Sequence, residues 1–230
     1  MQKVNVIIPV FNESGSIGFV LKDIPAGIVE EVIVVNNGST DNTAEIARRN
    51  GATVLLEERK GYGSACLKGW EYIRNKPADQ QPDIIVFIDG DYSDYPEQLP
   101  LLIAPIIQGE YDLVIGSRSK GKRIKGSMAP QQIFGNWLAT TLMRLFFGAR
   151  FSDLGPFRAI RRTSFEALQM KDTNYGWTVE MQIKAAKQKL RYTEVPVDYR
   201  PRIGQSKITG TVKGTVMAGY KIIATIFKYF

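Results

Sequence analysis

Histidine is absent from the 230-residue sequence, and cysteine occurs once, at Cys66. Without imidazole, proton transfer near neutral pH falls to carboxylates, or the reaction needs no strong base. A single cysteine excludes an internal disulfide and favours a reducing compartment. An apolar run begins at Val4 with no signal pattern before it, so we expect a cytoplasmic protein. The length suits one large domain, or one domain with an extension.

Charge is divided unevenly along the chain. Residues 1–118 hold 10 Lys or Arg against 17 Asp or Glu, whereas residues 119–230 hold 20 against 6. We expect a metal-binding first half and an anion-binding second half. Nucleic acid, a phosphorylated lipid and an anionic membrane surface are the anions that would suit the basic half.

The central feature is the apolar run 84–88, which is followed by Asp89, Gly90 and Asp91. Such a run predicts a buried parallel strand, and open α/β sheets bind ligands at the carboxyl ends of their strands. Two carboxylates this close repel each other unless a cation joins them, and oxygen ligands suit Mg²⁺ or Mn²⁺. The alternative is a solvated turn, because Asp and Gly are ordinary turn residues.

Strand and helix patterns alternate through the first half, which predicts a Rossmann-like α/β fold with a mostly parallel sheet flanked by helices. The predicted strands are residues 4–8, 32–35, 53–56, 84–88 and 112–115. Parallel strands end at one edge of a sheet, so the polar residues at these ends should converge there. These residues are Glu13, Asn37, Asp89, Asp91 and Arg118. In the second half, residues 192–199 alternate as a strand, and Pro196 suggests an edge position.

Gly61 and Gly63 begin the helix after the third predicted strand. This pattern is not a dinucleotide fingerprint, because it follows the third strand and Cys66 takes the place of a third glycine. One interpretation is a helix N-terminus that receives a phosphate with help from Arg59 and Lys60. The other is close packing of the helix at the two glycines.

Three motifs resemble those of the inverting family 2 glycosyltransferases and occur in the same order. Residues 8–13 resemble the opening strand motif of that family, residues 36–41 its Asp-Asp-Gly-Ser-Thr-Asp loop, and residues 89–91 its metal-binding Asp-x-Asp. The resemblance implies the GT-A fold and a nucleotide-sugar donor. The implied donor site comprises Pro9, Phe11, Glu13, Asn37, Lys60, Asp89, Gly90 and Asp91.

The resemblance also implies roles within this site. Glu13 would bind the ribose or the base, Asn37 would lie under the base, and Asp89 and Asp91 would hold the diphosphate through Mg²⁺ or Mn²⁺. The family usually has Asp where this chain has Asn36 and Asn37. An amide both donates and accepts hydrogen bonds, like the edge of uracil, so we expect a UDP-sugar rather than a GDP-sugar.

Residues 153–158 and 202–207 resemble the subset that glycosylates polyprenyl phosphate, such as the dolichyl-phosphate mannose and glucose synthases. This resemblance implies an acceptor phosphate held by Arg200, Arg202, Ser206 and Lys207. It predicts Asp89, Asp91, Arg118, Arg202 and Lys207 as the catalytic groups. An ordinary basic surface loop is the alternative, and Gln131 stands where that subset often has a basic residue.

The acceptor determines whether a base is needed. A phosphate oxygen is already anionic and needs no strong base, whereas a sugar hydroxyl would need a carboxylate. Asp153 and Glu180 are the candidates for such a base. Glu180 has the alternative role of a favourable charge near a helix N-terminus.

Two predicted helices suggest a lipid partner. Residues 131–148 carry apolar side chains on nearly all faces, which predicts either deep burial or contact with lipid. Residues 212–230 carry an apolar side and a lysine-bearing side, which is typical of a helix in a membrane interface. Packing on the domain or on a second subunit is the alternative for this helix. Neither segment predicts a membrane-spanning helix.

We therefore expect a GT-A domain at residues 1–210, comprising a nucleotide-sugar-binding half (1–118) and an acceptor-binding half (119–210), followed by an amphipathic helix (211–230). The predicted enzyme is peripheral on the inner face of the membrane, with polyprenyl phosphate and not nucleic acid as its partner. Three alternatives remain: a family 2 enzyme acting on a sugar or lipid hydroxyl, a nucleotidyltransferase, and a non-catalytic nucleotide-sugar-binding module. The acidic segment 11–14 disfavours the nucleotidyltransferase, which usually has a glycine-rich basic loop there.

Overall fold

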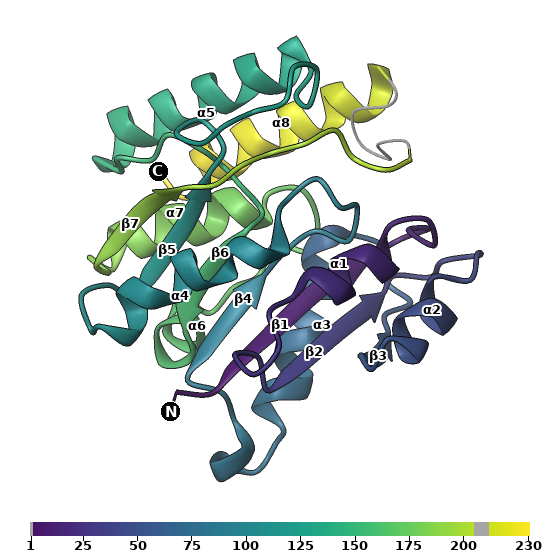
Figure 1. Cartoon of the computed structure of the whole chain (residues 1–230). Helices are drawn as coiled ribbons and strands as arrows, with labels where there is room; N and C mark the ends of the chain where they lie inside the picture. Colours follow the sequence, from purple (N-terminus) through teal and green to yellow (C-terminus); the bar gives the residue numbers. More distant parts are fainter. Residues whose placement is uncertain (1, 205–211) are drawn as a thin grey trace.

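A computed structural model describes residues 2–204 and 212–230. These residues form a seven-stranded sheet with the strand order β3-β2-β1-β4-β6-β5-β7 and helices on both faces (Figure 1). The strands are β1 (Val4–Val10), β2 (Glu31–Asn36), β3 (Thr53–Leu56), β4 (Ile84–Phe87), β5 (Leu113–Ser117), β6 (Arg158–Arg161) and β7 (Tyr192–Pro196). The helices are α1 (Ile17–Asp23), α2 (Thr43–Arg49), α3 (Tyr62–Arg74), α4 (Leu99–Ile107), α5 (Pro130–Phe147), α6 (Arg162–Leu168), α7 (Trp177–Lys187) and α8 (Val212–Lys228), with 3₁₀ turns at Ala78–Gln80 and Pro96–Gln98.

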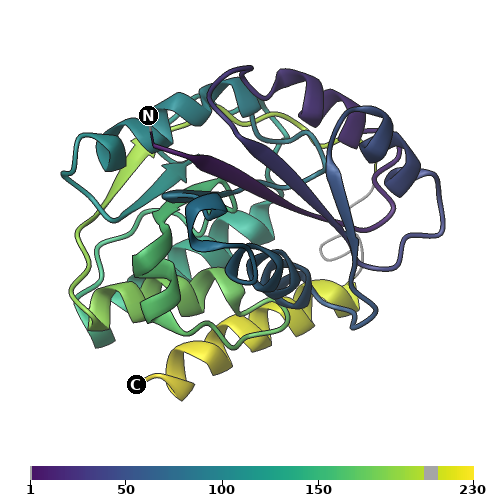
Figure 2. The same cartoon turned by 90° about the horizontal axis from the view of Figure 1, so that it is seen from below.

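The central strand β4 is buried on both faces, which explains its continuous apolar sequence. Ile84 and Val86 point into a core that α1, α2 and α4 cover, whereas Ile85 and Phe87 point into a second core under α3, α5, α6, α7 and α8. Figure 2 shows these two helix layers on opposite sides of the sheet. The predicted α/β fold is confirmed.

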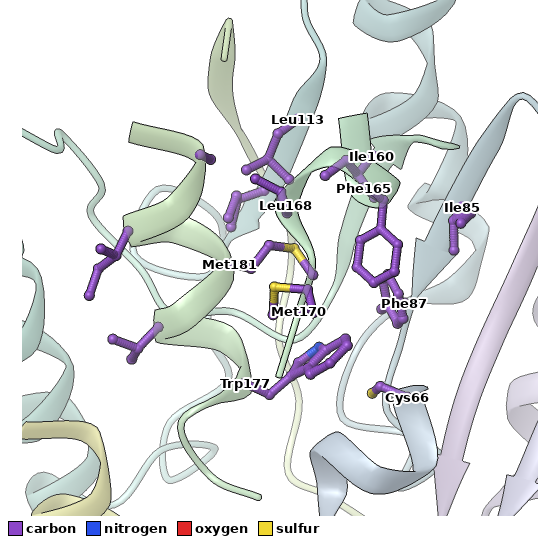
Figure 3. Packing of buried hydrophobic residues seen from close by; sticks show 14 of the residues in the cluster. Cys66, Ile85, Phe87, Leu113, Ile160, Phe165, Leu168, Met170, Trp177 and Met181 are labelled. Atoms are coloured by element: carbon purple, nitrogen blue, oxygen red, sulfur yellow. The ribbon is translucent and has the colours of Figure 1, made fainter. Parts of the chain in front are cut away.

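Aromatic rings fill the second core beneath the end of β4. The ring of Phe87 lies 5.4 Å from that of Phe165 and 5.9 Å from that of Trp177 (Figure 3). Offset and edge-to-face rings at such distances add directional packing to the burial of apolar area. This cluster gives the strand end that carries Asp89 a close-packed support.

Strand β6 runs antiparallel between β4 and β5, and its Arg158 pairs in register with Phe87 and with Ile115. The other strand pairs in the sheet are parallel. β7 lies at the edge of the sheet, as Pro196 suggests. The sheet is therefore mostly parallel, with one strand from the second half inserted into the middle.

The glycines at the start of α3 allow close packing. A Cβ atom on Gly61 or Gly63 would lie 2.1 Å from the backbone oxygen of Thr173 or Asp172, respectively. The backbone N–H of Ser64 donates to the Thr173 oxygen at 2.9 Å. The first turn of α3 thus packs directly on a backbone segment, which supports the packing interpretation.

Helices α5 and α8 lie side by side along one side of the molecule (Figure 1). In α5, Ala139, Thr140 and Met143 are buried, whereas Phe134 and Trp137 are exposed. In the described helices, none combines the length and apolar character needed to cross a bilayer. The predicted domain boundary at residue 210 falls at 205–211, outside the described residues, and the interfacial role of α8 stays a prediction.

Candidate active site

The carboxyl edge of the sheet forms a cavity of about 300 Å³. It is lined by every residue predicted for the donor: Pro9, Phe11, Glu13, Asn37, Lys60, Asp89, Gly90 and Asp91. Their convergence follows from the parallel order of β2, β1 and β4, whose carboxyl ends meet at this edge. We call this the first cavity.

A second cavity, of about 280 Å³, adjoins the first. The two share five lining residues: Tyr62, Asp89, Asp91, Tyr175 and Arg202. The second cavity is also lined by Arg118, by Gln131, Gln132 and Asn136 of α5, and by Ala218, Gly219 and Ile222 of α8. The metal-motif aspartates therefore lie at the boundary between two cavities, one lined mainly by the first half and one mainly by the second.

Asp89 has an unusual electrostatic environment. Its Oδ1 atom is buried and has no hydrogen-bond partner among the described residues. Burial and the neighbouring Asp91 charge raise the pKa of Asp89 to about 7, against the opposing effects of Arg202, a hydrogen bond from Tyr62, and Arg118. A buried carboxylate oxygen without a donor is a suitable ligand for a hard divalent cation.

Asp91 uses its two oxygens differently. Oδ1 accepts hydrogen bonds from the backbone N–H and hydroxyl of Ser93, at 2.9 and 2.6 Å. Oδ2 lies 3.2 Å from Nη1 of Arg202. Within the described residues, no three His, Cys, Asp or Glu side chains gather as a complete metal site. The oxygen-only pair Asp89 and Asp91 fits Mg²⁺ or Mn²⁺ if a bound diphosphate and water supply the remaining ligands.

Arg202 connects the two halves of the site. Its Nη2 atom donates to Oε1 of Glu13 at 3.0 Å, and its Nη1 atom pairs with Asp91. The backbone N–H of Ile203 donates to the backbone oxygen of Asp91 at 3.0 Å, which holds this segment beside the metal motif. Glu13 was expected to bind the ribose or base, and its pairing with an arginine 189 residues later had no signal in the sequence.

Arg118 is held by Asp153. Its Nε and Nη2 atoms donate to the two Asp153 oxygens at 2.9 and 2.6 Å, and its backbone N–H donates to Oδ2 at 2.7 Å. Asp153 is completely buried. Its carboxylate orients Arg118 toward the second cavity and is already committed to that contact.

Glu180 does not line either cavity. It is buried in α7 and accepts hydrogen bonds from the backbone N–H groups of Lys171 and Asp172 and from the hydroxyl of Tyr229. Burial opposes the ionised form, but these hydrogen bonds and the one from Lys184 outweigh it and lower the pKa of Glu180. The geometry gives Glu180 a structural role away from both cavities.

The guanidinium of Arg200 packs on residues 92–94, which directly follow the metal motif. Its guanidinium carbon is 3.4 Å from the centroid of the Tyr92 ring, and it donates to the backbone oxygens of Tyr92 and Asp94. Ser206 and Lys207, predicted for the acceptor phosphate, lie outside the described residues.

The Asn37 amide lines the first cavity and is held by the backbone of residues 57–61. Its nitrogen donates to the backbone oxygens of Glu57 and Arg59, and its oxygen accepts from the N–H of Gly61. The Lys60 ammonium lies 4.4 Å from the centroid of the Phe11 ring. Because the Asn37 amide is engaged with backbone, its hydrogen-bonding character gives no direct support to uracil over guanine.

The family model described as glycosyl transferase family 2 matches residues 5–169, which is more than half of the chain. The chain is a family 2 glycosyltransferase. The family recognised from the three motifs and the expectation of an enzyme are both confirmed. The three motifs, at residues 8–13, 36–41 and 89–91, all lie within the matched range.

Two curated relatives are similar to this glycosyltransferase. The low-salt glycan biosynthesis hexosyltransferase Agl6 of Haloferax volcanii is 33% identical over 210 residues, which are 89% of this chain and 49% of that protein. The undecaprenyl-phosphate mannosyltransferase of Micrococcus luteus is 30% identical over 226 residues, which are 92% of this chain and 90% of that protein. The chain therefore spans about half of the first relative and most of the second.

A solved structure shares the fold. Glucosyl-3-phosphoglycerate synthase from Mycobacterium tuberculosis, crystallised with Mn²⁺, UDP and glucosyl-3-phosphoglycerate, superposes with a TM-score of 0.73 over 99% of this chain and 80% of that chain. The sequences are 24% identical. The likeness confirms the predicted GT-A-like fold of the glycosyltransferase.

Several residues of the site were not predicted. Tyr62, which hydrogen-bonds Asp89, directly follows Gly61, and that position was its only signal. Tyr175 and Trp177 line the second cavity from a segment that lies outside the motifs resembling the family. Tyr199 lines it because residues 199–203 fold back beside Asp91, which only the tertiary structure reveals.

Proposed function

We propose that this glycosyltransferase transfers a hexose from a nucleotide-sugar, a UDP-sugar rather than a GDP-sugar, to a polyprenyl phosphate at a membrane surface, with Mg²⁺ or Mn²⁺ as cofactor. The observation that carries the proposal is the meeting of two cavities at Asp89, Asp91 and Arg202. The first cavity is lined by the residues predicted for the donor. The second is lined in part by α5 and α8, helices that also carry exposed apolar side chains. A donor and a lipid-borne acceptor would meet at this boundary.

The donor half is supported by the chemistry of the first cavity. It combines an aromatic ring at Phe11, the polar side chains of Glu13 and Lys60, and the aspartate pair. The fold relative from Mycobacterium tuberculosis was crystallised with UDP and Mn²⁺. A divalent cation held by Asp89 and Asp91 would neutralise the charge of the departing diphosphate.

The acceptor half is supported by an exposed apolar surface on α5 and α8, which we call the apolar helix face. Its members are Ile133, Phe134, Trp137 and Leu145 of α5, Val216, Met217, Tyr220 and Phe227 of α8, and Phe230, all of which are at least 45% exposed. The ring of Phe146 in α5 lies 5.6 Å from that of Phe227 in α8 and 4.8 Å from that of Phe230, so aromatic rings connect the two helices at this end. Exposed apolar side chains gathered on two adjacent helices are typical of an interaction surface, and Trp and Tyr favour the lipid headgroup region.

A lipid phosphate is the acceptor that suits the engaged carboxylates. Asp153 is bound to Arg118, and Glu180 lies away from both cavities, so neither predicted base faces the acceptor as a free carboxylate. A phosphate oxyanion attacks the anomeric carbon without a base and inverts its configuration. Arg202 and Arg118 would orient that phosphate and screen its charge from the donor diphosphate. The Micrococcus relative is named for undecaprenyl phosphate.

The test is transfer of radiolabelled sugar by the purified full chain. The protein is incubated with Mn²⁺, polyprenyl phosphate and each of a panel of UDP- and GDP-hexoses, and labelled product is extracted into chloroform. Chloroform-soluble product with a UDP-hexose supports the proposal. Product formed only with phosphoglycerate or a sugar hydroxyl would overturn the lipid acceptor, and transfer only from GDP-hexoses would overturn the UDP preference.

A matched pair of variants tests the site within the same assay. Arg202→Lys keeps the charge but removes the fork that reaches both Glu13 and Asp91, so we expect transfer to fall by roughly tenfold or more. Arg74→Lys makes the same change at an exposed position at the end of α3 and should leave the rate unchanged. Equal transfer rates for the two variants would show that Arg202 has no role in sugar transfer.

A further inference from the structure

Helix α8 and Tyr229, the residue that follows it, contact two buried carboxylates. The ammonium of Lys221 lies 3.1 Å from Oδ2 of Asp172. The hydroxyl of Tyr229 donates to Oε1 of Glu180 at 2.5 Å. Asp172 and Glu180 are 6% and 0% exposed, so each of these contacts involves a carboxylate that is largely removed from water.

These two carboxylates organise residues 171–176, which we call the wall segment. The segment has no regular secondary structure, so side chains must satisfy its backbone N–H groups. Glu180 accepts from the N–H groups of Lys171 and Asp172, the second at 2.6 Å. Asp172 Oδ1 accepts from the N–H groups of Asn174 and Gly176, at 2.7 and 3.2 Å.

The wall segment lies between α8 and the start of α3. On one side, the Thr173 oxygen accepts from Ser64 at 2.9 Å, where the α3 glycines allow close approach. On the other side, a Cβ atom on Gly176 would lie 2.4 Å from the Thr225 hydroxyl of α8. Both sides are in direct contact, so a shift of α8 would have to move the segment or open a gap.

The wall segment contributes Asn174 and Tyr175 to the first cavity, and Tyr175 also lines the second. We infer that Lys221 and Tyr229 are positioning residues: by holding Asp172 and Glu180, they place Asn174 and Tyr175 so that the first cavity can bind its nucleotide. This inference rests on the proposed function, in that the first cavity is the donor site. Helix α8 thereby serves the donor site as well as the apolar helix face.

Binding in lipid-free buffer separates this role from membrane attachment. Titration calorimetry of the full chain measures the Kd of UDP and of GDP in the presence of Mn²⁺, with no vesicles or detergent. The pair Lys221→Met and Lys228→Met removes one positive charge from α8 each time. Lys228 is exposed and makes no ion pair within residues 2–204 and 212–230. Its ammonium lies 5.3 Å from the centroid of the Tyr229 ring, so Lys228→Met controls for the loss of a charge and of this ring contact while the Tyr229 hydroxyl stays in place.

For the nucleotide that the unmodified protein binds, Lys221→Met should raise Kd about fivefold, the effect of losing a partly exposed ion pair worth up to ~1 kcal/mol. Lys221→Arg should restore the affinity, and Lys228→Met should leave it unchanged. Tyr229→Phe, which keeps the ring and removes only the hydroxyl, should also raise Kd while the melting temperature stays within a few degrees. If Lys221→Met does not fold, the Kd of Tyr229→Phe tests the inference in its place.

Two results would overturn the inference in distinguishable ways. If the unmodified protein binds UDP or GDP and the Lys221 and Tyr229 variants bind it equally well, α8 does not position the donor site, and the proposed function stands. If the unmodified protein binds neither nucleotide with Mn²⁺, the donor assignment itself fails, and the inference fails with it.

Discussion

Asp89 and Asp91 have different surroundings although one residue separates them. Asp91 is satisfied by Ser93 and Arg202, whereas Oδ1 of Asp89 has no partner among the described residues. The folded protein therefore holds one carboxylate in place and leaves the other in need of a cation. A buried carboxylate oxygen without a donor makes the ionised form costly to the fold, and residues retained at such cost are typical of functional sites.

The ionised Asp89 carboxylate should lower the stability of the folded protein. Its pKa of about 7 in the folded protein is above the ordinary 3.8, so stability is present at low pH and is lost as pH rises through 7. Asp89→Asn should raise the free energy of unfolding of the metal-free protein at pH 8 by about 1–2 kcal/mol, which raises its melting temperature by a few degrees. This gain in stability should shrink toward pH 4. The same variant should abolish sugar transfer.

The control for this prediction is Asp79→Asn, which removes an exposed carboxylate and should change neither property. Differential scanning calorimetry at several pH values, with a chelator present, measures the difference. A gain in stability that does not depend on pH would show that the Asp89 charge is not its cause.

At the scale of elements, contact between α3 and the wall segment demands glycine. Gly63→Ala would place a Cβ atom 2.1 Å from the Asp172 oxygen, so backbone has to move. We expect a loss of about 2–3 kcal/mol in the free energy of unfolding. Gly135→Ala in α5 has open space around its added Cβ atom and should gain about 0.5–1 kcal/mol, because alanine favours helix. Denaturant unfolding of the pair tests both signs, and a stabilised Gly63→Ala would contradict the close approach.

The apolar helix face gives a prediction for α5. Replacing Phe134 and Trp137, which are 60% and 58% exposed, with serine should weaken binding to anionic vesicles by roughly tenfold or more, because each ring carries apolar area into the bilayer. The melting temperature should change little. Leu56→Ser, at a 57% exposed position on β3, makes a comparable surface change away from the two helices. Cosedimentation that falls equally for both variants would argue against this face as the membrane contact.

At the scale of the whole molecule, the site depends on segments from both ends of the chain. Glu13 and Asp89 come from the acidic half, and Arg202 and Tyr175 come from the basic half. A ligand at the boundary should therefore stabilise the fold as one unit. We expect Mn²⁺ and UDP together, at about 100 times Kd, to raise the temperature of a single unfolding transition by roughly 5–10 °C.

Two controls accompany this measurement. UDP with a chelator should produce a smaller shift, because the diphosphate then lacks the cation that joins it to Asp89 and Asp91. Mn²⁺ alone should also produce a smaller shift. Separate transitions for the two halves, of which only one responds to the ligand, would contradict a site formed jointly by both.

The strands of the first half, and the gathering of the residues predicted for the donor in one cavity, could be predicted because they depend on local order. Each apolar run is continuous, each polar motif follows its run, and parallel strands must end at one edge. The roles of Asp153 and Glu180 could not be predicted in the same way. Their partners Arg118 and Tyr229 are 35 and 49 residues away, and only packing determines which carboxylate meets a cation and which faces a cavity.

By itself, the sequence determined the alternation of strands and helices and the edge of the sheet at which the predicted donor motifs gather, because these follow from periodicity and strand order. The tertiary structure alone decided that β6 enters the sheet antiparallel beside β4, that Arg202 reaches Glu13, and that α8 supports the wall segment. Such contacts join residues far apart in the chain. They form where the largest apolar area is buried with its polar groups satisfied, and no local pattern encodes that global balance.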